Sequence, residues 1–67
     1  MDDYEYVNFS QDHEMNYRLR RVDKRQTESN RDELRTMGKE LKSNLSKTRL
    51  THGEFHPYVL KNKARLE

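Results

Sequence analysis

The residues best suited to contact a charged partner are the bases between Arg18 and Arg25. Five Lys or Arg side chains fall within these eight positions: Arg18, Arg20, Arg21, Lys24 and Arg25. On a helix, Arg18, Arg21 and Arg25 would share one face at a spacing of i, i+3, i+7. Such a ridge can neutralise the phosphates of RNA or DNA, or contact an acidic protein surface. The run is therefore a candidate binding site, with an ordinary solvated helix face as the alternative.

The histidine pair His52 and His56 has the i, i+4 spacing that can aim two imidazoles at one metal ion on a helix. The surrounding sequence opposes this interpretation. Pro57 disfavours helical geometry at the residue before it, and Gly53 weakens the turn between the two histidines. We therefore expect no metal site here.

Catalysis requires a concave pocket that excludes water, and a chain of 67 residues can hardly spare side chains to line one. His13 lies between two acidic residues but has no nucleophile near it in sequence. The absence of cysteine excludes thiol redox chemistry, Cys-based zinc sites and a disulfide scaffold. We expect no enzyme activity, no cofactor and no small-molecule substrate.

Charge is distributed unevenly along the chain. Residues 1–16 hold five acids and no Lys or Arg, whereas residues 17–67 hold 14 bases and seven acids. The two parts could attract each other, so that an acidic arm docks over a basic surface and screens it; simple solvation is the alternative. Aromatic and β-branched residues concentrate at 4–9, which favours a short strand or an extended arm. We predict an acidic N-terminal arm over residues 1–10, followed by one small helical domain over 11–65.

The first helix is predicted over residues 11–26, with Ser10 as its N-cap. Its apolar stripe is thin and consists of Met15, Leu19 and Val22. Residues 14–20 also show some alternation with period two, so a β-hairpin that pairs them with residues 4–9 is an alternative. The chain lacks the Asn-Gly or Asp-Gly turn typical of such hairpins, which favours the helix.

The second helix is predicted over residues 30–46, where Asn30 followed by Glu33 resembles a capping box. Gly38 adjoins its apolar face and implies either close approach of another backbone or weak local stability. The apolar face is a seam with heptad-like spacing, formed by Leu34, Met37, Leu41 and Leu45. This seam is interpreted either as core packing within the monomer or as a surface shared with a partner helix.

The C-terminal region is predicted to form a turn over residues 51–56 and a short helix over 57–65. Thr51 and Glu54 have capping-box spacing, and Pro57 suits the first position of a helix. Leu66 and Glu67 receive no functional weight, because this dipeptide is what many expression vectors leave before an affinity tag, so the pair can be a cloning scar.

The expected fold is therefore mainly α, a small helical hairpin or three-helix unit with an extended acidic arm. Leu, Val and Phe make only 12 of the 67 residues, below the level of roughly 20% at which disorder becomes an alternative. Chains of this size gain only about 3–5 kcal/mol from one core. Since no disulfide can add stability, oligomerisation or a binding partner is the remaining source.

These features indicate a small non-catalytic binding or regulatory protein that acts through helix-mediated protein–protein interaction or self-association, for example as a homodimer. The alternative is a nucleic-acid-binding accessory factor that uses the basic segment 18–25. No apolar run approaches the roughly 20 residues that span a bilayer, and the acidic N-terminus lacks the features of a signal peptide. We therefore expect a cytoplasmic protein with no membrane contact.

Overall fold

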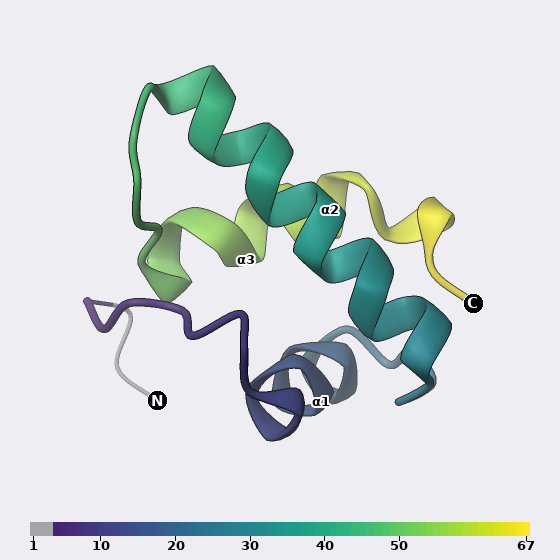
Figure 1. The fold of residues 1–67 in the computed structure, drawn as a ribbon. Coiled ribbons are helices and arrows are strands. Elements are labelled where there is room, and N and C mark those ends of the chain that lie inside the picture. The colour runs from purple at the N-terminus through teal and green to yellow at the C-terminus, as the bar shows by residue number, and fades with distance from the viewer. Residues whose placement is uncertain (1–3) are drawn as a thin grey trace.

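The computed structural model describes residues 4–67, which form three α-helices and one 3-10 turn. In chain order these are α1 (Asp12–Arg21), α2 (Glu28–Leu45), α3 (His52–Lys61) and the turn η1 (Lys63–Arg65). The long helix α2 runs diagonally across the molecule, and both α1 and α3 pack against it (Figure 1). The prediction of a mainly α three-helix unit is confirmed. Two acids of the predicted arm, Asp2 and Asp3, lie outside the described residues.

The core is built from one face of each helix, closed by single residues from the arm, from the loop before α3 and from the C-terminus. Both predicted stripes contribute to it, with one exception: Leu45, the last residue of the seam, is 44% exposed. The buried apolar side chains are Val7, Met15, Leu19, Val22, Leu34, Met37, Leu41, Leu50, Phe55, Val59 and Leu66.

The N-terminal arm pairs with the segment that leads into α3. Val7 N donates to Leu50 O at 2.8 Å, and His52 N donates to Glu5 O at 2.9 Å, on either side of a single antiparallel bridge between Tyr6 and Thr51. The alternative hairpin between residues 4–9 and 14–20 is therefore wrong, because residues 14–20 are helical and the arm pairs elsewhere. Among residues 4–67 this bridge is the only β-type pairing.

The arm also explains Gly38 in α2. A Cβ atom at this position would lie 2.5 Å from Cε1 of Phe9, so only glycine leaves room for the ring. The same ring packs edge to face on Phe55, with 5.0 Å between the ring centroids. Of the two explanations that the sequence left open, close approach applies, but it is made by a side chain of the arm rather than by another backbone.

Helix α1 is shorter at both ends than predicted. Its N-cap is Gln11, which makes no side-chain capping bond, and the predicted cap Ser10 instead donates to Asn8 Oδ1 at 2.6 Å. The helix stops at Arg21 because Asp23 has a left-handed φ of 56°. Lys24 N then donates to Leu19 O at 2.9 Å, which closes a Schellman motif.

Helix α2 begins earlier than predicted, because Thr27 and not Asn30 caps it. Thr27 Oγ1 accepts from Asn30 N at 3.1 Å. Asn30 is buried inside the first turn, where its amide donates to Arg25 O at 2.8 Å and accepts from Glu67 N at 2.9 Å. Asn30 thus ties the α1–α2 loop to the C-terminal end of the chain.

Helix α3 follows its capping box directly, so the predicted turn over 51–56 is wrong. Thr51 Oγ1 accepts from Glu54 N, and Glu54 Oε1 accepts from Thr51 N at 2.9 Å. Pro57 is the sixth residue of the helix rather than the first. Its missing N–H leaves the carbonyl of Gly53 without the usual i, i+4 bond, which is tolerated because Gly53 is exposed to water.

The last residues complete the core rather than trailing from it. Leu66 is only 5% exposed, and its carbonyl accepts from Lys24 Nζ at 3.2 Å. Within residues 4–67, the longest helix is too polar to serve as a membrane-spanning segment, and the others are too short.

Candidate functional site

The side chains of the basic segment 18–25 do not form one continuous ridge on the surface. Arg18 is buried at 3% exposure, and α1 ends at Arg21, so Lys24 and Arg25 follow in the loop. Arg21 donates to the hydroxyl of Tyr17 at 3.0 Å. Of the five predicted residues, Arg20, Arg21 and Arg25 are exposed.

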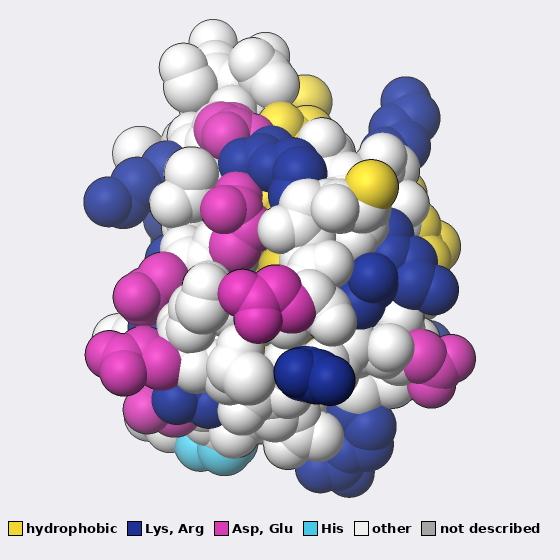
Figure 2. All heavy atoms as spheres, turned by 90° about the vertical axis from the view of Figure 1, so that its right-hand side faces the viewer, with side chains coloured by type: hydrophobic (Ala, Val, Ile, Leu, Met, Phe, Trp, Pro, Cys, Tyr) yellow, Lys and Arg dark blue, Asp and Glu magenta, His cyan; other side chains and the backbone are white. Residues whose placement is uncertain are grey.

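Several other bases are neutralised by acids within the fold. Arg35 Nη2 lies 2.6 Å from Asp12 Oδ1, so one acid of the N-terminal part does contact the basic body. Arg65 pairs with Glu33 and Glu40. Hydrogen bonds from Arg65 and from Tyr58 hold the pKa of Glu40 at about 2. Figure 2 views the end of the molecule where α2 starts and the chain ends, and there acidic and basic side chains are intermingled.

An apolar groove lies where the C-terminal end of α2 faces α3. The groove has a volume of about 430 Å³. Leu41, which is buried, and Leu45, which is half exposed, line its α2 side. The α3 side is lined by Gly53, Glu54, Pro57, Tyr58 and Lys61. The seam predicted from the sequence is therefore divided: its first three residues pack in the core, and the fourth opens onto a surface.

A second exposed leucine lies on the outward side of α3, although it does not line the groove. Leu60 is 50% exposed and lies three residues after Pro57 in α3. Gly53, Pro57 and Leu60 have the spacing i, i+4, i+7, so they form one continuous outward stripe of the helix. This surface was not predicted from the sequence.

The groove carries opposite charges at its two ends. Glu54, near the start of α3, forms an ion pair with Lys47 and accepts the capping bond of Thr51. These contacts, led by the one from Lys47, lower the pKa of Glu54, which keeps its carboxylate ionised. Lys61, near the end of α3, forms no ion pair with the described residues.

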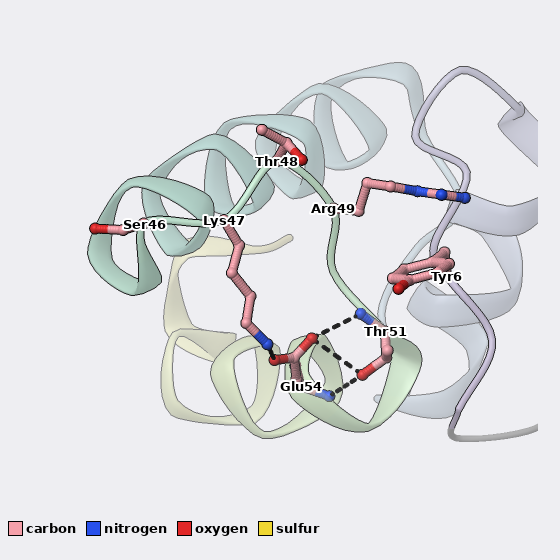
Figure 3. A pocket seen from close by; sticks show the side chains of 7 residues that line it. All are labelled: Tyr6, Ser46, Lys47, Thr48, Arg49, Thr51 and Glu54. Atoms are coloured by element: carbon pink, nitrogen blue, oxygen red, sulfur yellow. Dashed lines mark hydrogen bonds and ion pairs between the residues drawn. The ribbon is translucent and has the colours of Figure 1, made fainter.

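A polar pocket of about 380 Å³ adjoins the groove on the other side of Glu54. The loop before α3 forms one wall, and Tyr6 of the arm forms the other (Figure 3). The guanidinium carbon of Arg49 lies 3.9 Å from the centroid of the Tyr6 ring, a cation–π contact. The lining residues are Tyr6, Ser46, Lys47, Thr48, Arg49, Thr51 and Glu54.

A buried polar cluster joins α1 to α3. His52 is 1% exposed, and its Nε2 lies 3.1 Å from Glu14 Oε1. The same carboxylate oxygen accepts from Asn8 N at 3.2 Å. Burial lowers the pKa of His52 below its usual value, and the charge of Arg18 lowers it further, although Glu14 opposes both. A neutral imidazole can donate from Nε2 to Glu14, whereas its buried Nδ1 has no hydrogen-bond partner among the described residues.

The two histidines of the i, i+4 pair both lie in α3, contrary to the expectation that Pro57 and Gly53 prevent helical geometry there. His52 points into the core toward Glu14, as its burial and hydrogen bond show. Across the part of the chain that the structure describes, no three His, Asp or Glu side chains gather where they could hold a metal ion.

No family model matches this chain, and neither a curated protein nor a solved structure is similar to it.

Proposed function

We propose that this chain is a small non-catalytic protein-interaction module, whose groove between α2 and α3 receives the apolar face of a helix from another protein chain. The observation that carries the proposal is the division of the seam. Leu34 and Met37 are completely buried in the monomer, whereas Leu41 lies at the floor of a concave apolar surface and Leu45 remains half exposed at its rim. Helix-in-groove recognition uses this combination of a hollow and exposed apolar anchors.

The size of the surface sets the expected affinity. Complete burial of an exposed leucine contributes about 1.5–3 kcal/mol, and Leu45 and Leu60 are already about half buried. Association also costs several kcal/mol of rigid-body freedom. The groove therefore supports a weak, reversible complex, with a Kd of about 1 mM to 1 μM, as is typical of transient regulatory contacts.

Selection of peptides against the immobilised protein tests this proposal. The library is a displayed set of random helical peptides. The affinity of each selected peptide is then measured for the wild type, for Leu45→Glu and for Thr36→Glu. Thr36 is an exposed residue of α2 that does not line the groove. We expect peptides with apolar residues at i, i+4, i+7 that bind at least tenfold more weakly to Leu45→Glu and equally well to Thr36→Glu. Failure to enrich any such peptide, or equal binding to all three proteins, would contradict the proposal.

Nucleic-acid binding is the second candidate function. The exposed bases Arg20, Arg21 and Arg25 of the basic segment support it, and so does the pairing of Arg49 with the half-exposed ring of Tyr6. Phosphate neutralisation combined with aromatic stacking is how many proteins bind single strands. Ion pairs within the fold reduce the charge available for such contacts, which is why protein interaction ranks first.

Titration into labelled single-stranded RNA and DNA at two salt concentrations decides this second candidate. Phosphate contacts require that affinity fall steeply as salt rises. Replacing Arg20, Arg21 and Arg25 together by Glu should then abolish binding while helicity, read by circular dichroism, stays unchanged. Unaltered binding by the triple variant would show that these bases are only solvated surface.

A further inference from the structure

We infer that the occupant of the groove is a second copy of this chain, related by a two-fold axis near Pro57 that sets the two α3 helices antiparallel. This inference rests on the proposed function of the groove and adds the identity of the partner. A two-fold interface must be self-complementary, so that one surface carries both a projection and the hollow that receives it.

The outward stripe of α3 meets this requirement. Leu60 projects at one end of the stripe, and Gly53, which has no side chain, lies at the other end and lines the groove. The exposed Pro57 lies between them. Antiparallel pairing centred near Pro57 places Leu60 of each copy over Gly53 of the other. Both projecting leucines are then covered in one step, while Pro57 and Lys61 of each copy, which line the groove, face the other copy.

The charges of the groove point to the same arrangement. Glu54 and Lys61 lie at opposite ends of the groove, seven residues apart in α3, a rise of about 10 Å. Their midpoint is close to Pro57, so the same two-fold axis brings Lys61 of each copy near Glu54 of the other, where it joins the ion pair that Glu54 forms with Lys47 of its own chain. Lys61 has no ionic partner among the described residues of its own chain. A parallel arrangement would instead face like charges.

The competing occupant is an acidic peptide from another protein. It would bind the bases of the polar pocket, chiefly Arg49, which lie outside the contact between the two copies. A second copy is favoured because it supplies the projection, the hollow and both charges without any unseen component. An acidic peptide would use only the bases.

Sedimentation equilibrium over a concentration series up to about 1 mM tests the inference on four proteins. The wild type should change from a mass of 8.2 kDa when dilute toward twice that value. Leu60→Glu should weaken dimerisation at least tenfold. Gly53→Gln should do the same while leaving the monomer at least as stable, because glutamine is the better helix former and its side chain occupies the space for Leu60. Thr36→Glu should match the wild type.

Isotope-filtered NMR on a mixture of labelled and unlabelled protein locates the interface. We expect intermolecular contacts from the Leu60 methyl groups to Gly53. A mass that stays at 8.2 kDa throughout the series overturns the inference. So does a dimer that is indifferent to both Leu60→Glu and Gly53→Gln. Peptide binding to a monomer that never dimerises would uphold the groove as a docking site and identify the partner as another protein, so the two failures are distinct.

Discussion

His52 of α3 and Glu14 of α1 meet inside the protein, with 3.1 Å between the imidazole Nε2 and the carboxylate Oε1. The groups that face this imidazole are Glu14 and Arg18 from α1, and the backbone N–H of Asn8 reaches the same carboxylate from the arm. The contact therefore joins the arm, α1 and α3.

The depressed pKa of His52 predicts that acid destabilises the fold. In the unfolded chain this histidine takes up a proton as pH falls through its usual value of 6.5, whereas in the folded chain it stays neutral to lower pH. The unfolded state then binds more protons, so the free energy of unfolding falls as pH drops below about 6.5. Urea unfolding followed at pH 7.5 and pH 5.5 should show this loss in the wild type.

The variant His52→Gln should be less stable than the wild type at pH 7.5 but should lose less stability on going to pH 5.5. His13→Gln, at an exposed position of α1, is the matched control and should follow the wild-type profile. If both variants kept the wild-type dependence on pH, the acid sensitivity would have to come from other groups.

Gly38→Ala should destabilise the protein, although alanine is the better helix former by about 1 kcal/mol. The new methyl group would lie 2.5 Å from the ring of Phe9, which is itself packed on Phe55 and covered by Lys42. We expect a loss of about 1–3 kcal/mol in the free energy of unfolding, measured with denaturant. In a Phe9→Leu background, Gly38→Ala should reduce the free energy of unfolding by less than it does in the wild-type background. Equal effects in the two backgrounds would mean that the Phe9 ring is not the reason why position 38 requires glycine.

Leu41→Ala and Leu45→Ala should differ sharply, although the two leucines belong to one seam. Leu41 is 7% exposed and packs in the core, so its truncation should cost about 2–5 kcal/mol of unfolding free energy. Leu45 is 44% exposed, and its truncation in the dilute monomer should cost about 1 kcal/mol or less. Chemical denaturation of both variants checks this. A large loss for Leu45→Ala in dilute solution would show that the monomer itself depends on this side chain.

Arg65→Gln should raise the pKa of Glu40 from about 2 toward its usual value of 4.5. Arg65 supplies the largest stabilisation of the carboxylate, and the hydrogen bond from the Tyr58 hydroxyl at 2.8 Å remains in the variant. The new pKa should therefore fall between these two values. Carboxyl chemical shifts recorded from pH 6 to pH 2 measure it, with Arg25→Gln as a control at an exposed base that pairs with no acid among residues 4–67. A pKa unchanged by Arg65→Gln would contradict this ion pair in solution.

Helix periodicity was readable from the sequence, and so was one of the three predicted N-caps. The stripe of Met15, Leu19 and Val22 is buried as predicted, and the capping box of Thr51 and Glu54 is confirmed. Both depend on residues close together in the chain, whose side chains interact through the geometry of a single helix.

Features that depend on distant residues were not readable. Asn30 has the residue type and spacing of an N-cap, but it is buried because the C-terminus and Arg25 use its amide. Pro57 lies inside α3 because the capping box starts the helix at His52 and packing of Phe55 and Val59 holds it. The groove could not be predicted for the same reason, since it exists only where the end of α2 meets α3.

The central claim, that the groove is an interaction surface, is tested most directly by methyl NMR of Leu41 and Leu45 while a selected peptide or unlabelled protein is added. We predict that the methyl resonances of Leu45, and those of Leu41 at the floor of the groove, shift in a saturable manner. The methyl resonances of Leu19, which is buried in α1, should stay in place. Saturable binding that leaves the Leu41 and Leu45 methyl groups unchanged would contradict the claim.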